Sequence, residues 1–298
     1  MPTIAVIGPG AVGGAVAAWL AQSPRNEVTL AARTTFRRLA VDIGDEVLRA
    51  SPRIIAHPSE ATPVDWVLVA TKTYDVRSAA AWFPGFSEEQ TRIAILQNGV
   101  EHAERFAPYV PSERLLPVMV DLPAERTAPG RVRQLGLGHL AVARSDDGAD
   151  FARLFRGGGI RVTEAEDMTT VLWRKLCLNA AGAISAATLA PMRVARHPAV
   201  AQYLRHVVGE AVAVGRAEGA RLDDGLVDRI LKNAQESSPD AINSLHADRL
   251  AGRPLETDAR NGAIVRIGRR HGIPTPRNAE LVGLLEAVAA QASVIPRA

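Results

Sequence analysis

The chain has 298 residues, of which 47% are hydrophobic, and this length suits two domains with substantial cores. Its formal net charge of +3 arises from basic residues scattered along the chain, a pattern that argues against nucleic-acid binding. The single cysteine, Cys177, excludes an internal disulfide and fits a reducing compartment. The sequence shows neither a signal peptide nor an apolar run suited to a bilayer. We therefore expect a cytoplasmic protein with no membrane or nucleic-acid partner.

The first half of the chain alternates short apolar runs with helical segments. Runs of this length, rich in valine and isoleucine, are typical of strands buried on both faces of a parallel sheet. Four are expected as strands: Thr3–Ile7, Glu27–Ala31, Val64–Ala70 and Ile93–Gln97. A helix is expected over Ala11–Gln22, between the first two strands. This alternation predicts an α/β domain.

Further strand-like runs follow, and they are separated by turn signals such as Pro129-Gly130. The runs Leu115–Val120, Arg131–Gln134 and Leu140–Arg144 are expected as antiparallel additions to the sheet edge, and Ile160–Thr163 as a last strand. After Asp167 only helical periods remain: residues 168–188, 199–219, 224–236, 241–252, 257–272 and 277–291. We therefore expect two domains, an α/β domain over 1–166 and an all-α domain over 167–298.

A glycine-rich motif joins the first strand to the first helix. Its residues are Gly8, Pro9, Gly10, Ala11, Val12 and Gly13, which is the pattern G-x-G-x-x-G. The first glycine permits a tight turn, the second allows a pyrophosphate to approach the backbone, and the third allows the helix to pack on the strand. The N–H groups of the helix N-terminus then face the phosphates. A turn without ligand is the alternative, but the strand–loop–helix context favours a Rossmann-type dinucleotide site.

The residue after the second strand distinguishes NAD from NADP. NAD sites usually place an acidic residue there, whereas this chain has Arg33, twenty positions after Gly13. A guanidinium pairs well with a 2′-phosphate, so NADP is favoured as the cofactor. The alternative is an ordinary surface arginine in an arginine-rich chain.

Two more loops follow strands, where ligands bind in sheets of this kind. One carries Lys72, which is expected to contact the adenosine side or the phosphates of the cofactor. The other, Gln97-Asn98-Gly99, carries Asn98, which is expected to contact the nicotinamide ribose or the substrate. A plain turn at Asn98-Gly99 is the alternative.

Taken in order, these motifs resemble the ketopantoate reductase family, also called 2-dehydropantoate 2-reductases. The resemblance continues through Thr127-Ala128-Pro129-Gly130, Trp173–Asn179, Ser244, Asp248, Glu256-Thr257-Asp258, Asn261-Gly262 and His271–Pro276. It implies a cytoplasmic enzyme that uses NADPH to reduce a 2-oxo acid to a 2-hydroxy acid, as in the conversion of ketopantoate to pantoate during pantothenate biosynthesis. It also implies an active site in the cleft between the two domains.

The resemblance assigns the general acid to Lys175. Hydride transfer to a ketone creates an alkoxide, which needs a proton donor. Lysine can lose its proton when it is buried, and only three of the 35 basic residues are lysines. Asn179 lies four residues later, on the same face of a helix, and is expected to orient Lys175 or to bind the substrate. A surface lysine is the alternative.

By the same resemblance, Glu256 accepts hydrogen bonds from a substrate hydroxyl and Ser244 holds the carboxylate end. Both also have structural alternatives, because an acidic residue is favoured at a helix start and a serine is common within a helix. The seven histidines have no metal-ligand spacing, so no metal is expected. Cys177 is expected in the core rather than as a nucleophile.

The chain departs from the family pattern at several expected amides. Family members that act on ketopantoate carry asparagines where this chain has Ala183, Arg193 and Ala241, although Asn243 lies near the last. A shifted substrate preference is one expectation, since lost hydrogen-bond partners alter selectivity. The other is that Arg193 points to solvent and Asn243 substitutes, which leaves ketopantoate as the substrate.

Three further alternatives remain open. A related two-domain dehydrogenase would act on another 2-oxo or 3-hydroxy acid. A non-catalytic NADP-binding regulator would keep the first domain without the chemistry, although it has no need of a proton donor. A homodimer is compatible with the helical half, but no heptad or exposed apolar patch predicts one.

Overall fold

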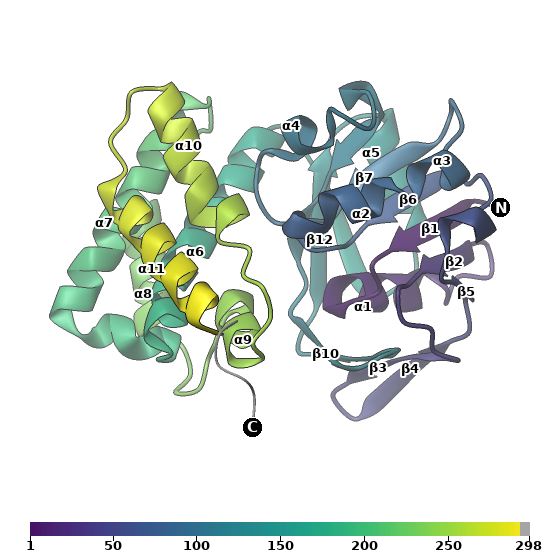
Figure 1. Cartoon of the computed structure of the whole chain (residues 1–298), viewed down its shortest axis with the longest axis horizontal. Helices are drawn as coiled ribbons and strands as arrows, with labels where there is room; N and C mark the ends of the chain where they lie inside the picture. The colour runs from purple at the N-terminus through teal and green to yellow at the C-terminus, as the bar shows by residue number, and fades with distance from the viewer. Residues whose placement is uncertain (293–298) are drawn as a thin grey trace. The chain divides into compact units, whose positions relative to one another are not determined.

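The computed structural model describes residues 1–292, and its chain forms two compact units (Figure 1). The N-terminal unit contains residues 1–97 and 102–168. The helical unit contains Asn98–Glu101 and the chain from Thr169 onward. A short segment of the first half therefore packs with the second half, which sequence reasoning did not anticipate.

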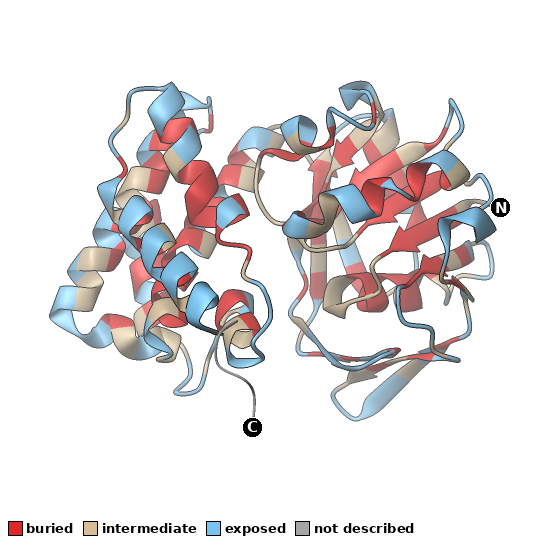
Figure 2. Ribbon diagram, in the orientation of Figure 1, coloured by how far each residue is buried: buried red, intermediate tan, exposed pale blue. Residues whose placement is uncertain are grey.

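The N-terminal unit is built on a six-stranded parallel sheet with the order β5-β2-β1-β6-β7-β8. The strands are β1 (Thr3–Ile7), β2 (Glu27–Ala31), β5 (Arg53–Ile55), β6 (Trp66–Val69), β7 (Arg92–Ile95) and β8 (Leu115–Pro117). The four predicted strands of the first half are confirmed. Figure 2 shows the middle of this sheet as buried, as expected for strands covered on both faces.

Alternate residues of β1 enter two separate cores. Ile4 and Val6 pack with α1 (Ala11–Leu20), whereas Ala5 and Ile7 pack with aromatic residues on the opposite face of the sheet. The short helices of that face are α2 (Val76–Ala80), α3 (Phe83–Phe86) and α4 (His102–Phe106). The short turns are η1 (Pro58–Glu60), η2 (Thr73–Asp75) and η3 (Ser112–Arg114). This layering fixes α1 directly behind the glycine-rich loop.

The added strands form two further sheets, which corrects their expected place at the edge of the main sheet. One sheet has the order β10 (Ala124–Ala128), β11 (Arg131–Gln134), β3 (Leu39–Ile43) and β4 (Glu46–Ala50). The other has the order β13 (Ile160–Ala165), β12 (Gly138–Ala143) and β9 (Met119–Asp121), and helix α5 (Asp146–Leu154) contacts β13. Of the strands that were expected as antiparallel additions, only β8 joins the main sheet, and it pairs with β7 in parallel.

The pairing within these sheets is mixed. β10 pairs with β11, β3 with β4 and β9 with β12 in antiparallel fashion, whereas β11–β3 and β12–β13 are parallel. Leu39, Val41 and Val132 of the four-stranded sheet share a core with α1. The apolar face of this sheet is therefore covered by α1. The β3–β4 hairpin was not predicted.

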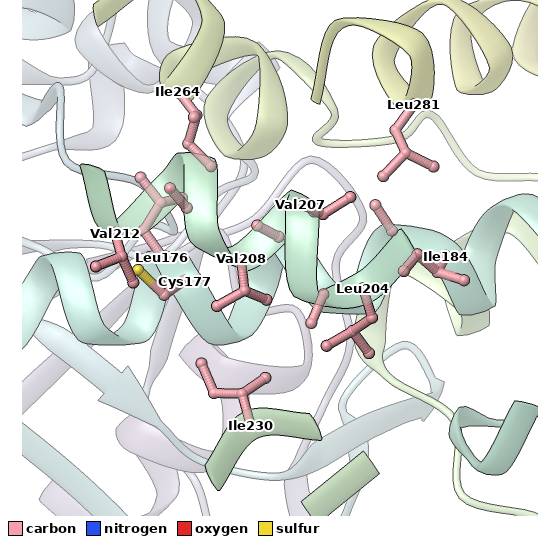
Figure 3. Packing of buried hydrophobic residues seen from close by; sticks show 14 of the residues in the cluster. Leu176, Cys177, Ile184, Leu204, Val207, Val208, Val212, Ile230, Ile264 and Leu281 are labelled. Atoms are coloured by element: carbon pink, nitrogen blue, oxygen red, sulfur yellow. The ribbon is translucent and has the colours of Figure 1, made fainter. Parts of the chain in front are cut away.

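The helical unit consists of six α-helices, one 3₁₀ turn and one π-helical turn within the described residues. They are α6 (Met168–Thr188), η4 (Met192–Arg196), α7 (Pro198–Ala217), α8 (Leu226–Glu236), α9 (Ser244–Leu250), η5 (Asp258–Gly262), α10 (Ala263–Arg270) and α11 (Pro276–Ala292). Apolar side chains of α6 and α7 interlock in one core with those of α8, α10 and α11 (Figure 3). The predicted helices are present, and the predicted fold class, a Rossmann-type domain with added strands followed by an all-α domain, is confirmed.

The helix expected over 257–272 begins with the π-helical turn η5. The Gly262 N–H donates to the Thr257 carbonyl oxygen at 3.0 Å, a hydrogen bond that spans five residues. This turn lies between Glu256 and α10, so it sets the direction of the side chains that follow Glu256. Among residues 1–292, no helix is long and apolar enough to cross a membrane.

Candidate active site

The glycine-rich loop of the N-terminal unit has the geometry of a phosphate-binding turn. Gly8 has a φ of +85°, and a Cβ there would lie 2.7 Å from the Thr71 Cγ2 atom. A Cβ on Gly13 would lie 2.3 Å from the Gly8 carbonyl oxygen, so α1 packs closely on the loop. At Gly10, by contrast, the nearest such atom is 4.0 Å away. The space in front of Gly10 is therefore open.

The N-terminus of α1 also suits a bound anion. Gly10 is its N-cap residue and has no side chain with which to accept a hydrogen bond from the first turn. The first turn contains Ala11, Val12 and Gly13, whose N–H groups have no partner within the helix. An α-helix of ten residues presents partial positive charge at this end. The predicted loop thus fits the pyrophosphate of a dinucleotide.

Arg33 lies just beyond β2 and is paired with an acidic residue that sequence reasoning missed. Its Nη2 atom lies 3.2 Å from the Asp75 Oδ2 atom, and its side chain is 77% exposed. Asp75 ends the turn η2, which begins directly after Lys72. The two predicted cofactor-contacting cations, Arg33 and Lys72, therefore stand on adjoining segments, with a carboxylate beside the first.

A buried glutamine fixes the Lys72 loop to the end of β7. The Gln97 Nε2 atom donates to the Thr71 hydroxyl at 3.0 Å and to the Lys72 carbonyl at 3.2 Å. The carbonyl of Gln97 faces the His102 Nε2 atom at 3.1 Å. These bonds stiffen the carboxyl edge of the sheet, where a cofactor would lie.

In the helical unit, three of the predicted polar residues form a connected chain. Asn179 on α6 donates from Nδ2 to the Asn98 Oδ1 atom at 3.2 Å. Asn98 in turn donates from Nδ2 to the Glu256 Oε2 atom at 3.0 Å. Lys175 is partly buried and precedes Asn179 by one turn of α6, on the same face. These residues, far apart in sequence, therefore supply one polar surface.

The segment that carries Asn98 is anchored to the helical unit by an ion pair. Arg266 of α10 donates to both carboxylate oxygens of Glu101, from Nη2 at 2.7 Å and from Nε at 3.3 Å. Gly99 has a φ of +104°, and a Cβ there would lie 2.9 Å from the Ala259 carbonyl oxygen. Asn98-Gly99 is therefore more than a plain turn, because its close approach to η5 requires glycine.

Ser244 begins α9, and its hydroxyl contacts a buried arginine. The Arg260 Nη2 atom donates to the Ser244 Oγ atom at 2.8 Å. Arg260 is only 1% exposed, and burial lowers the pKa of its guanidinium, whereas the charges of Glu256 and Asp248 raise it. Asp248 also pairs with Arg253, whose Nε atom lies 2.8 Å away. A buried network of charges thus underlies Ser244 and Glu256.

The residues that depart from the family pattern are placed as follows. Ala183 is fully buried, and Arg193 lies exposed on η4. The Asn243 side chain caps α9, accepting from the N–H groups of Leu245 and His246, and it donates to the Gly182 carbonyl at 2.9 Å. Its amide is therefore engaged within the protein.

Cys177 is fully buried on α6, and burial raises the pKa of its thiol to about 12. A thiol in that state is a poor nucleophile. Its expected place in the core is confirmed.

The structure places the predicted site residues in two groups. The predicted cofactor contacts of the glycine-rich loop, Arg33 and Lys72 lie in the N-terminal unit, and the other predicted residues lie in the helical unit. Sequence reasoning missed Asp75, Glu101, Arg260 and Arg266. The spacing of Glu256 and Arg260, four residues apart at the start of the expected helix, was an available signal for Arg260.

The chain is similar to known proteins over both of its units. Residues 4–147 match the family model described as ketopantoate reductase PanE/ApbA, and residues 167–289 match the model of its C-terminal part. A 2-dehydropantoate 2-reductase of Caulobacter vibrioides is 50% identical over 289 residues, which cover 97% of this chain and 100% of that protein. One of Mycobacterium tuberculosis is 39% identical over 288 residues, covering 95% of this chain and 97% of that protein.

Solved structures lead to the same family. A PanE/ApbA family ketopantoate reductase from Ralstonia eutropha superposes with a TM-score of 0.89 at 32% identity, covering 98% of this chain and 99% of that chain. The match extends over both units, as do the motifs described above. The chain therefore belongs to the ketopantoate reductase family.

Proposed function

We propose that this chain is an oxidoreductase that reduces ketopantoate to pantoate with NADPH, a step of pantothenate biosynthesis. The observation that carries the proposal is the connected polar surface of Asn179, Asn98 and Glu256, on the helix face that also bears Lys175. A chain that only sensed NADP would have no use for this surface.

NADPH, when bound, supplies the hydride. The N–H groups at the start of α1 hold its pyrophosphate, and the open space at Gly10 admits it. Arg33 pairs with the 2′-phosphate, and Lys72 contacts the adenosine side or the phosphates. Asn98 is proposed to contact the nicotinamide ribose or the substrate.

The helical unit supplies the proton and the substrate contacts. Lys175 donates a proton from Nζ to the alkoxide oxygen that forms when the ketone is reduced, and its positive charge stabilises that oxygen beforehand. Asn179 keeps its amide beside Lys175 and fixes the orientation of Asn98. The lysine must then be reprotonated from solvent before the next turnover.

Glu256 and Ser244 hold the two ends of the substrate. Glu256 is buried and accepts a hydrogen bond from the Asn98 amide, and its charged carboxylate is also the proposed acceptor for the substrate hydroxyl. Ser244 donates a hydrogen bond from its hydroxyl to the substrate carboxylate. Together they select a molecule with a hydroxyl at one end and a carboxylate at the other.

Ketopantoate is proposed as the native substrate, in preference to a different 2-oxo acid. Relatives that are 50% and 39% identical are named for its reduction. The engaged amide of Asn243 argues against its acting as a substitute donor, so the selectivity rests on Glu256 and Ser244. We also propose that residues 1–166 bind NADP, that residues 167–298 bind substrate, and that the protein is cytoplasmic. Homodimer formation stays a prediction for size-exclusion chromatography.

The test is NADPH oxidation measured against ketopantoate and a panel of 2-oxo acids. We expect ketopantoate to give the highest kcat/KM, within the usual range of roughly 10⁴–10⁸ M⁻¹s⁻¹ for a native substrate. A higher kcat/KM for another acid would reassign the substrate. NADPH binding without turnover on any acid would favour the regulator instead.

A further inference from the structure

A fully buried arginine lies beneath the proposed carboxylate-binding serine. Arg260 is 1% exposed, whereas Ser244 lies exposed at the start of α9. The Arg260 Nη2 atom donates a hydrogen bond of 2.8 Å to the Ser244 Oγ atom. A charged side chain at this depth is unusual in a protein core, and it needs compensation.

That hydrogen bond fixes the direction in which the serine can donate. A serine hydroxyl has one proton, and its oxygen here already accepts from Arg260. Among the described residues, no hydrogen bond from the Ser244 hydroxyl to a protein acceptor is found, so its proton is available on the exposed side of the serine. The serine is thereby arranged as a donor to a ligand.

Arg260 shares its two neighbouring carboxylates with other side chains. Glu256 and Asp248 attract it, but Asp248 also pairs with Arg253 and Glu256 accepts from Asn98. The Arg260 Nε atom is buried and has no hydrogen-bond partner among the described residues. A guanidinium stays charged at neutral pH, so its field acts on whatever anion meets Ser244.

We propose that Arg260 is the specificity-determining residue for the substrate carboxylate, acting through Ser244. Its guanidinium holds the serine oxygen, which leaves the serine proton for the carboxylate, and its buried charge strengthens that hydrogen bond. Arg260 is therefore a positioning residue rather than one that touches the substrate. This inference rests on the proposed function, because Ser244 is assigned there to the carboxylate end.

The experiment compares a charged ligand with its neutral counterpart. Calorimetry would give the Kd of pantoate and of pantoamide, which has an amide in place of the carboxylate, with the protein saturated in NADP⁺. For the unmodified chain we expect pantoate to bind more tightly. In Arg260→Met, we expect the ratio of the two Kd values to fall roughly 10- to 100-fold, which corresponds to the free energy that one charge-assisted hydrogen bond contributes.

Three further variants separate this role from a structural one. Arg269→Met removes an exposed arginine of α10 and should leave the preference unchanged. Arg260→Lys keeps the positive charge but lacks the planar guanidinium, so it should lose less of the preference for pantoate over pantoamide. It also replaces Arg260→Met in the test if that variant does not fold. In a Ser244→Ala background, Arg260→Lys or Arg260→Met should change the preference far less than in the unmodified chain, because the two residues act through one contact.

The outcomes are distinct. If the Arg260 variants weaken pantoate and pantoamide equally, the arginine only neutralises Glu256 and Asp248, and the inference is overturned while the proposed function stands. If the unmodified chain binds neither ligand and does not reduce ketopantoate, the proposed function fails and the inference fails with it.

Discussion

The preference for NADPH over NADH can be estimated from the surroundings of Arg33. A charge-assisted hydrogen bond to the 2′-phosphate contributes about 1.5–3 kcal/mol. Against this, Arg33 must leave Asp75, and an ion pair as exposed as this one contributes about 0–1 kcal/mol. The difference, about 0.5–3 kcal/mol, corresponds to a preference of roughly 2- to 160-fold for NADPH.

Two substitutions test each side of that balance. Arg33→Ala should abolish most of the preference and leave NADH affinity nearly unchanged. Asp75→Asn removes the competing carboxylate, so it should tighten NADPH binding by up to about fivefold. Arg25→Ala, at the opposite end of β2, is the matched control and should change neither affinity.

The assay is a binding titration of both cofactors at one fixed ionic strength, because salt screens exposed charges. Equal affinities of the unmodified protein for NADPH and NADH would refute the reasoning. So would an Arg33→Ala variant that loses both cofactors equally, since that would assign the arginine to a shared part of the dinucleotide.

Four other substitutions or treatments have defined outcomes. Lys175→Ala should lower kcat by roughly 10²- to 10⁴-fold with unchanged NADPH affinity, and a variant that retains a tenth of normal turnover would place the proton donor elsewhere. Glu256→Gln should raise the KM for ketopantoate roughly 10- to 100-fold, as steady-state kinetics would measure, because a charged acceptor of the substrate hydroxyl becomes neutral. Gly99→Ala should lower the free energy of unfolding by about 1–3 kcal/mol in denaturant titrations, since its φ is positive and the new methyl group meets Ala259. Thiol-alkylating reagents should leave activity intact at pH 8, because a pKa raised to about 12 leaves Cys177 almost entirely as the thiol; rapid inactivation would contradict its burial.

The parts of the fold that sequence predicted are those with a strong local signal. The strands β1, β2, β6 and β7 are buried on both faces, so each is a nearly continuous apolar run. The hairpin β3–β4 was missed because the face that carries Asp42 and Arg49 is polar and does not enter the core, so the apolar stretches of the hairpin are short. Such a strand is defined by its partners in the sheet and by α1, which local sequence does not reveal.

The candidate site divides in the same way. The glycine motif is local, and the i, i+4 spacing of Lys175 and Asn179 needs only a helix. The partner of Arg33 lies 42 residues further along the chain, and the partner of Glu101 lies 165 residues away. Ion pairs of this kind depend on the tertiary fold, so no pattern within a short window predicts them.

The membership of Asn98–Glu101 in the helical unit has a consequence for how this family can change by recombination. A gene crossover near residue 167 would pass this segment on with the N-terminal half, while its anchor, Arg266, would come from the other parent. Hybrids whose parents differ at residues 101 and 266 should then lose the ion pair that secures Asn98. These two positions are therefore expected to be inherited together, although 165 residues separate them.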